Sequence, residues 1–428
     1  MAKTAAEALE KGYTEAIRDS LWGHIYLTPE LKALTESSAF LRLHRILQLG
    51  PVFRIYPGAT HTRAGHSIGV YHTARRLLKS LSAKGADSWI SREGVFSFLC
   101  ACLLHDLGHF PYAHSLKELP LESHEALTAA LILREPLSGY ISTAGGDPKL
   151  TAAIIDTSLP ADGDEILFYR KLLSGVLDPD KLDYLNRDAQ YCGVPYGAQD
   201  VDFILSRLEP HKNRGVDIDS RGIPSVESIL FSKYLMYRAV YWQHSVRSAT
   251  AMVKKALMSA LENKWISPGE LYGLDDQGLF LLMENRKAES SALCGLTERI
   301  RSGSLYQSVF EFHFAEKKHG SLADLEKRAA LEKELASGLA GILKTGVSSE
   351  EVIIDLPERI SFESGLFVKD ENKFFGESSS AFKPEMVEAF AESLRIIRIF
   401  ADPALSVTIL EKKNLIYEAV LKLTEKWA

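Results

Sequence analysis

The chain has 428 residues, of which 46% are hydrophobic and 25% are charged, and its formal net charge is −6 at pH 7. This composition is that of an ordinary globular protein with room for about two or three domains. The acidic balance argues against a broad nucleic-acid-binding surface. No segment reaches the roughly 20 apolar residues of a membrane span, and residues 1–18 lack an apolar signal region.

The cysteines indicate a reducing compartment. Their positions are Cys100, Cys102, Cys192 and Cys294. They form no CxxC pair, and the first two lie in an apolar segment where a thiol packs as a small hydrophobic side chain. We therefore expect free thiols, a cytoplasmic location and no membrane partner.

The first predicted elements are helices. Residues 4–20 are expected to form a short polar helix. A helix is also predicted over residues 66–81, and Gly65 and Gly69 at its start would allow a neighbouring segment to approach closely. His61, shortly before this helix, is expected to lie in a surface loop.

The most informative stretch follows residues 95–104, which are apolar on all sides and therefore predict a buried helix. His105 and Asp106 stand side by side at its end. A buried carboxylate without a partner costs several kcal/mol or more, by rough estimate. A bound cation would remove this cost, and a mixture of nitrogen and oxygen ligands suits Mn, Fe, Zn or Ni. His66 is the natural third ligand.

More histidines follow this pair along the chain. His109 and His114 come shortly after His105, and Pro111 between them interrupts a regular helix. We therefore expect the three imidazoles to surround one cavity. His124 and Glu125 begin another predicted helix and are candidates for acid and base chemistry.

A charged stretch over residues 178–188 contains further candidate ligands. Asp178 followed by Pro179 is typical of a helix start. Asp180, Asp183 or both would complete a metal site. A solvated helix face is the simpler interpretation of such a stretch taken alone.

The rest of the chain gives weaker signals. A long helix is predicted over 225–261, and its Arg238 is a candidate for phosphate binding, with a salt bridge as the alternative. Residues 269–345 are predicted to be helical. The final predicted elements are strands over 352–357, 365–375 and 394–400, and a closing helix over 404–427.

Taken together, six sequence blocks resemble the HD-domain phosphohydrolases, whose signature is H…HD…D, and within them the dNTP triphosphohydrolases. The blocks are Gln48-Leu49-Gly50, Tyr56 to Ala59, Arg63 to Val70, His105 to His114, His124-Glu125 and Asp180 to Asp188. The resemblance covers about residues 19–260. It implies a mainly α protein, with an HD helical core over residues 1–260 and a small α+β C-terminal region over 261–428.

The resemblance also implies the chemistry of the site. It implies hydrolysis of a dNTP to a deoxynucleoside and inorganic triphosphate. The metal would be divalent, one of Mn, Fe, Ni, Zn, Co or Mg, and its implied ligands are His66, His105, Asp106 and Asp180. The catalytic residues would be His114 or His109, one of which protonates or stabilises the departing 5′-oxygen, and His124 and Glu125, which orient that histidine. The implied substrate contacts are Gln48, Leu49, Arg63, Lys181, Tyr184, Asp188 and Arg238.

Three positions depart from the family pattern. Lys117 stands where the family has a carboxylate, and Tyr234 stands where it has an arginine for the terminal phosphate, so Arg238 or Arg247 would have to substitute. His44 replaces an arginine that reads an allosteric nucleotide. These departures leave other substrates open, namely a nucleoside monophosphate, a cyclic dinucleotide or (p)ppGpp, and they also leave open a nucleotide sensor without catalysis.

The resemblance finally implies partners. We expect a nucleotide substrate, a nucleotide activator and a homo-oligomer, either a dimer or a tetramer. Nucleic acid is not an expected partner, because the net charge of −6 is acidic.

Overall fold

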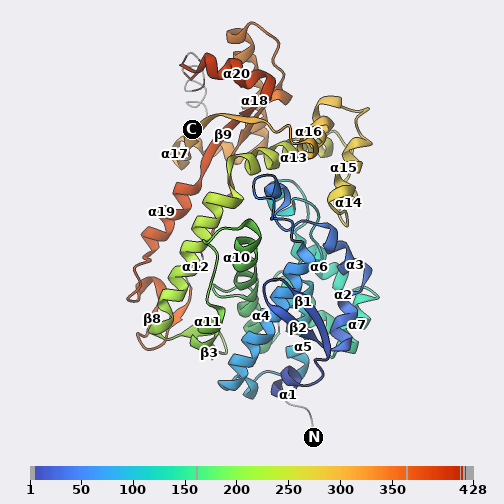
Figure 1. Ribbon diagram of the computed structural model, residues 1–428, viewed down its shortest axis with the longest axis vertical. Helices are drawn as coiled ribbons and strands as arrows, with labels where there is room; N and C mark the ends of the chain where they lie inside the picture. Colours follow the sequence, from blue (N-terminus) through green and yellow to red (C-terminus); the bar gives the residue numbers. More distant parts are fainter. Residues whose placement is uncertain (1–4, 161, 363–364, 415, 418–419, 421–428) are drawn as a thin grey trace.

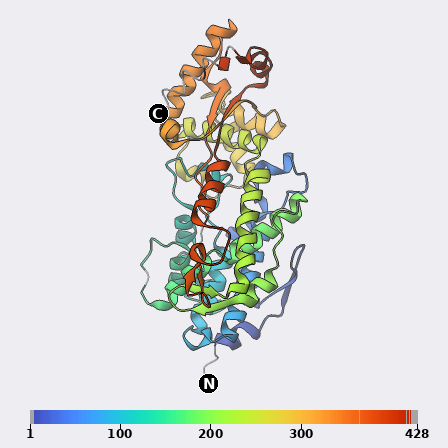
Figure 2. The same ribbon diagram turned by 90° about the vertical axis from the view of Figure 1, so that its left-hand side faces the viewer.

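A computed structural model describes residues 5–160, 162–362, 365–414, 416–417 and 420. The molecule is elongated, with the N-terminal half at one end and the small C-terminal sheet at the other (Figure 1). Figure 2, a quarter turn away, shows the same division along the long axis. The described part is mainly α-helical, which confirms the expected fold class. Within these residues, no helix combines the length and the apolar character that crossing a bilayer requires.

The helices and strands of the described residues have the following bounds. The first helices are α1 (Ala5–Glu10), α2 (Pro29–Thr35), α3 (Ser38–Arg42), α4 (Arg63–Ala83), α5 (Arg92–Leu104), α6 (His124–Ile132), α7 (Leu137–Ala144), α8 (Pro148–Ile155), α9 (Asp164–Leu173), α10 (Pro179–Cys192) and α11 (Val201–Arg207). The later helices are α12 (Ile223–Met236), α13 (His244–Glu262), α14 (Pro268–Leu271), α15 (Asp276–Glu284), α16 (Ser291–Ser302), α17 (Glu316–His319), α18 (Leu325–Leu343), α19 (Pro384–Leu394) and α20 (Pro403–Glu411). The strands are β1 (Glu15–Asp19), β2 (Gly23–Leu27), β3 (Leu208–His211), β4 (Gly215–Ile218), β5 (Gln307–His313), β6 (Val352–Asp355), β7 (Phe367–Val368), β8 (Lys373–Phe374) and β9 (Ile396–Ala401).

Helix α5 is the centre of the N-terminal core. Every residue from Gly94 to Leu104 is buried. The helix packs against α4 and α8, and α4 packs in turn against α10. An all-apolar sequence leaves no face for water, so the helix is stable only when other helices enclose it. This confirms the predicted buried helix and places its last turn, which precedes His105, inside the molecule.

Two glycines bring the segments around α5 into close contact. A Cβ on Gly69 would overlap the Asp183 side chain, so α4 and α10 can pack this closely only with glycine there. A Cβ on Gly108 would overlap the His124 carbonyl, so α6 begins directly against the loop that follows α5. The close approach expected at Gly69 is confirmed, whereas a side chain on Gly65 would make only an ordinary contact.

Several local predictions were wrong. The predicted helix over 4–20 ends at Glu10, because β1 pairs antiparallel with β2 and the pairing satisfies the backbone instead. The predicted helix over 225–261 is interrupted by a π-helical turn at Tyr237–Tyr241, after which the Gln243 side chain caps the start of α13. The predicted helical region 269–345 contains strand β5.

The chain returns to its N-terminal half between β6 and β9, before the central strand of the C-terminal sheet is added. That sheet has the order β5-β9-β6, with all strands antiparallel. Strand β7 pairs parallel with β4, and α19 packs along α12 (Figure 1). The segment predicted as a strand over 365–375 forms two short antiparallel strands, β7 and β8. The predicted closing helix over 404–427 corresponds to α20, and most of its second half lies outside the described residues. The domain boundary at residue 260 stays a prediction.

A buried network of charges ties α13 to the surrounding segments. The Arg247 guanidinium donates to both carboxylate oxygens of Asp355 at 2.9 and 2.6 Å. Lys254 Nζ lies 2.5 Å from Glu118 Oε2 and 3.3 Å from Glu358 Oε1. Burial alone would raise the pKa of Glu358, but the charges of Arg247 and Lys254 lower it to about 2.

This network predicts a loss of stability in acid. A carboxyl group with a depressed folded-state pKa stabilises the fold above its unfolded pKa and stops doing so as the pH falls through its folded pKa. Stability should therefore fall between pH 4.5 and about 2, partly because Glu358 is protonated there. Chemical unfolding at several pH values should show a shallower acid decline for Glu358→Gln. An identical pH slope in the variant and the wild type would contradict this assignment.

Candidate active site

Two histidines and two aspartates from three helices converge at one point. His66 lies in the first turn of α4, His105 and Asp106 follow α5, and Asp180 lies in the first turn of α10. His66 Nε2 lies 2.9 Å from Asp180 Oδ1. His105 Nε2 lies 3.3 Å from Asp106 Oδ1 and 3.9 Å from Asp180 Oδ1. The donor atoms are thus two imidazole nitrogens and carboxylate oxygens, a set that suits a divalent transition metal.

The other nitrogen of each imidazole is held from behind. His66 Nδ1 lies 2.9 Å from Asp183 Oδ2, and His105 Nδ1 lies 2.9 Å from the Cys102 carbonyl oxygen. Such partners hold the imidazole rings in place and leave each Nε2 directed at the cluster, where a metal ion would replace a proton. Asp183, which the sequence offered as an alternative ligand, therefore faces the outer nitrogen of His66 and is itself held by Arg187 at 2.8 Å.

The carboxylates of the cluster favour positive charge beside them. Burial would raise the pKa of Asp106, but the nearby His109, His105 and Arg63 hold it well below its ordinary value. Burial would lower the pKa of His66, but hydrogen bonds to Asp180 and Asp183 raise it to about 10. The carboxylates thus bind a proton on His66 firmly, and a metal cation in the same position would meet the same negative charge. The residues present therefore fit a metal ion.

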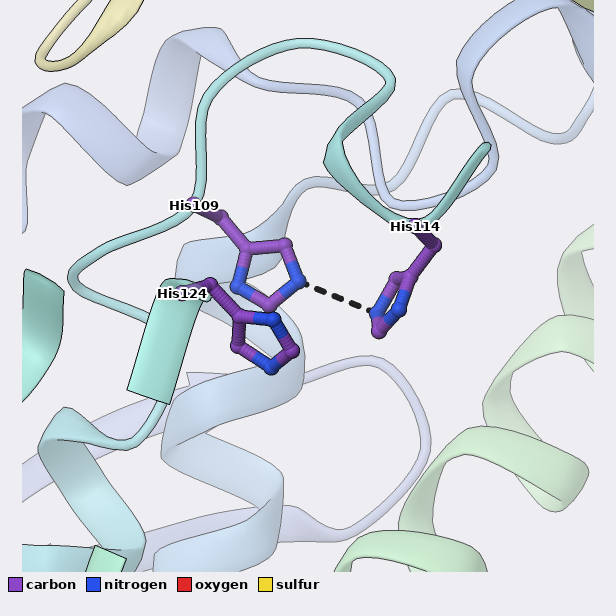
Figure 3. Close-up of side chains that lie close together, drawn as sticks. All are labelled: His109, His114 and His124. Carbon is purple, nitrogen blue, oxygen red and sulfur yellow. Dashed lines mark hydrogen bonds between the residues drawn. The ribbon is translucent and has the colours of Figure 1, made fainter. Parts of the chain in front are cut away.

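A second cluster, shown in Figure 3, contains His109, His114 and His124. His109 Nε2 lies 3.0 Å from His114 Nε2. The rings of His109 and His124 pack with centroids 3.9 Å apart, and His124 Nε2 lies 3.2 Å from Glu125 Oε1. His109 Nδ1 lies 3.1 Å from Asp106 Oδ1, so one carboxylate joins the two clusters.

His109 and His124 are neutral at neutral pH. Burial and then the charge of Arg63 lower the pKa of His109 well below its ordinary value. Burial lowers the pKa of His124 to about 4.

The backbone at Tyr112 brings His109 and His114 together. Its φ of 63° is left-handed and turns the loop between the two histidines.

Both clusters border one pocket of about 490 Å³. This volume is typical of a small-molecule site. The predicted substrate residues that line it are Gln48, Leu49, Arg63, Tyr184 and Asp188. Lys181 and Arg238 are not among the lining residues, because Lys181 Nζ lies 2.6 Å from Asp178 Oδ2 and Arg238 NH1 donates to the Tyr234 hydroxyl at 2.7 Å.

Two polar side chains in the pocket, Gln48 and Asp188, differ in whether they already have hydrogen-bond partners. Gln48 Oε1 is buried and has no hydrogen-bond partner, so it is available to a ligand. Asp188 is already held, because Oδ1 lies 2.8 Å from His61 Nε2 and Oδ2 accepts from the Tyr241 hydroxyl at 2.6 Å. His61 is therefore buried beside the pocket, and its predicted place in a surface loop was wrong.

Sequence reasoning missed the far wall of the pocket. Residues 358–361, which follow β6, line it together with Lys233 of α12. The side chain of Arg359 is 78% exposed and lies 4.0 Å from Glu388, which is a weak pairing. No motif marks these positions, because only the return of the chain along α12 brings them to the site.

The comparisons with known proteins agree with this geometry. Residues 63–145 match the HD domain family, and residues 200–382 match the family described as HD associated region. The uncharacterized protein MJ1154 of Methanocaldococcus jannaschii is 30% identical over 303 residues, which cover 70% of this chain and 60% of that protein. The deoxynucleoside triphosphate triphosphohydrolase SAMHD1 of Xenopus laevis is 28% identical over 214 residues, which cover 48% of this chain and 32% of that enzyme.

One solved structure extends the likeness over nearly the whole chain. A hypothetical protein from Aquifex aeolicus superposes with a TM-score of 0.72 at 25% identity, over 93% of this chain and 99% of its own. The matched region spans 50 to 60% of the length of three curated relatives. HD domains bind divalent metal ions, and the first cluster contains a histidine and aspartate set of that kind. The chain therefore belongs to the HD-domain phosphohydrolase superfamily and carries an HD associated region behind its HD domain.

Proposed function

We propose that this protein hydrolyses deoxynucleoside triphosphates to a deoxynucleoside and inorganic triphosphate. The observation that carries the proposal is one pocket bordered by the His and Asp cluster, by His114, whose Nε2 contacts His109, and by Gln48 and Leu49. The likeness to SAMHD1, named as a deoxynucleoside triphosphate triphosphohydrolase, supports this substrate class. In the reaction, water oxygen bonds to the α-phosphorus, the bond from that phosphorus to the 5′-oxygen breaks, and the 5′-oxygen takes up a proton.

The metal ligands in this proposal are His66, His105, Asp106 and Asp180. A bound divalent metal lowers the pKa of a coordinated water and polarises a phosphate oxygen. Arg63 NH1 lies 2.7 Å from Asp106 Oδ2, which fixes that carboxylate beside the phosphate position. The metal stays one of Mn, Fe, Ni, Zn, Co or Mg.

We assign proton donation to His114, supported by His109. His109 Nε2 would accept from His114 Nε2 across their 3.0 Å contact. The buried His109 Nδ1, which lies 3.1 Å from Asp106 Oδ1 without hydrogen-bond geometry, would then carry the ring proton. His114 must then be protonated to donate a second N–H into the pocket. The negative phosphates of a bound substrate would raise the pKa of His114 and favour that form. His124, paired with Glu125, packs against the buried His109 and limits its movement.

Residues that line the pocket would bind the sugar of the substrate. Gln48, with its unpartnered oxygen, and Asp188 would hydrogen-bond the sugar 3′-hydroxyl, and Tyr184 would pack beside them. Leu49 would press on the 2′-carbon and leave no room for a ribose 2′-hydroxyl. Lys181 and Arg238 keep only an indirect role, because both are engaged by neighbours outside the pocket lining.

The cations at the pocket favour a polyphosphate over a monophosphate. Arg63 and Arg247 are already paired with carboxylates, whereas Lys117 is exposed and has no ion pair among the residues that the structure describes. Lys117 and the exposed Arg359 both line the pocket. We assign the terminal phosphates to these two residues, which would supply the positive charge that Tyr234 cannot.

Other nucleotide substrates would fit the same metal cluster. A nucleoside monophosphate, a cyclic dinucleotide or (p)ppGpp would use the same metal cluster with fewer or different phosphate contacts. By resemblance to the family, the proposal also includes a homo-oligomer and a nucleotide activator. Size-exclusion chromatography with and without nucleotide tests whether nucleotide changes the oligomeric state.

The proposal is tested by turnover on metal-defined protein. Each dNTP and NTP is supplied singly and in pairs with Mn, Mg, Co or Ni, and the phosphate product is identified by chromatography. Triphosphate together with a free deoxynucleoside supports the proposal. Orthophosphate released from monophosphates would favour a nucleotidase, and bound nucleotide without any product would favour a sensor.

Removing a metal ligand should abolish both metal binding and activity. Asp106→Ala and Asp180→Asn are expected to lose about a thousandfold in rate, because a metal supplies several kcal/mol of stabilisation in the transition state. Metal content measured on purified protein should fall in parallel, while the control Asp202→Asn, which changes an exposed carboxylate on α11, keeps both. Full turnover in Asp106→Ala would contradict the assignment.

Removing the cations at the pocket should separate triphosphates from monophosphates. Lys117→Ala and Arg359→Ala are each expected to raise KM for a dNTP about tenfold, because a charge-assisted hydrogen bond contributes about 1.5–3 kcal/mol. The inhibition constant of the matching dNMP should stay unchanged. Lys149→Ala, an exposed lysine on α8, is the control. Equal losses for dNTP and dNMP would argue against a role in binding terminal phosphates.

A further inference from the structure

A short segment of the C-terminal half contacts the N-terminal half at three successive residues. This segment, Leu274–Asp276, joins α14 to α15. The Leu274 carbonyl accepts from Arg42 NH1 at 2.9 Å, and Asp275 Oδ2 accepts from Arg45 Nε at 2.5 Å. Asp276 Oδ2 accepts from the Leu47 amide at 2.9 Å. The segment therefore contacts Arg42, Arg45 and Leu47, which lie between the end of α3 and Gln48.

Arg42 extends this contact to the catalytic histidines. Its buried guanidinium also donates to the His109 carbonyl at 2.7 Å and to the Leu107 carbonyl. Burial lowers the pKa of Arg42 to about 10, so it keeps its charge at neutral pH. One rigid guanidinium thus links the Leu274 backbone to the loop that carries His109.

The Asp276 carboxyl is largely buried where it accepts from the Leu47 amide. Burial raises the pKa of this carboxyl to about 6, although the Leu47 amide and the charge of Arg63 act in the opposite direction. A carboxyl group with a raised folded-state pKa costs stability when it is ionised. Its hydrogen bond nevertheless fixes the Leu47 amide, which lies next to Gln48.

We propose that Leu274–Asp276 is a positioning segment for the active site. Through the Leu47 amide, Asp276 sets where Gln48 and Leu49 meet the substrate. Through Arg42, the Leu274 carbonyl sets where the backbone of His109 lies. The kinetic consequences rest on the proposed function, whereas the effect on the two loops does not.

The test compares three variants. Asp276→Ala removes the acceptor for the Leu47 amide, and we expect KM for the dNTP to rise about tenfold while kcat changes less than about twofold. Asp276→Asn keeps an acceptor oxygen without the buried charge, so it should restore the KM of the wild type. Glu284→Ala is the control, because it removes only an exposed ion pair with Arg301 at the other end of α15.

Hydrogen exchange gives a readout that does not depend on turnover. In folded Asp276→Ala, the amides of residues 47–50 should exchange about tenfold faster, because Leu47 loses its partner, while those of α4 and α5 keep their rates. Unchanged exchange and unchanged KM in the folded Asp276→Ala variant would overturn the proposal. Faster exchange in a protein that turns over no dNTP would support the positioning role and contradict the proposed function.

Discussion

The buried carboxylate of Asp106 is the group on which the rest of the site depends. It stands at the inner end of an apolar helix, where an unpaired charge would cost several kcal/mol or more, by rough estimate. One oxygen lies 2.7 Å from Arg63, and the other lies between His105 and His109 at 3.3 and 3.1 Å. The same carboxylate therefore belongs to the metal cluster and supports the histidine that contacts His114. In the proposed reaction, this couples activation of the attacking water to protonation of the leaving oxygen.

The central features of this arrangement were predictable because they are local. An all-apolar helix that ends in His-Asp is unusual in a single sequence, and its burial follows directly from its composition. The helix start at Asp178 and Pro179 was equally local, and the structure has it as the N-cap and first residue of α10. What spacing could not decide was the choice between Asp180 and Asp183. Packing places Asp183 behind His66, on the nitrogen that faces away from the cluster.

The remaining features depend on contacts between distant residues. His61 is buried because Asp188 of α10 lies against it. The π-helical turn after α12 places Tyr237 and Tyr241 in the pocket wall. Helix propensity does not predict such a turn. Arg359 and the positioning segment reach the site only because the chain returns past its own first half. No periodicity or motif in the sequence marks such contacts.

The central claim is attack of water on the α-phosphorus with departure of the intact triphosphate. Hydrolysis of a dNTP in water enriched in oxygen-18, followed by mass spectrometry of the products, tests this most directly. The account predicts one labelled oxygen in inorganic triphosphate and none in the deoxynucleoside. Label in orthophosphate or pyrophosphate, with the nucleotide still carrying phosphate, would mean attack at another phosphorus and would contradict it.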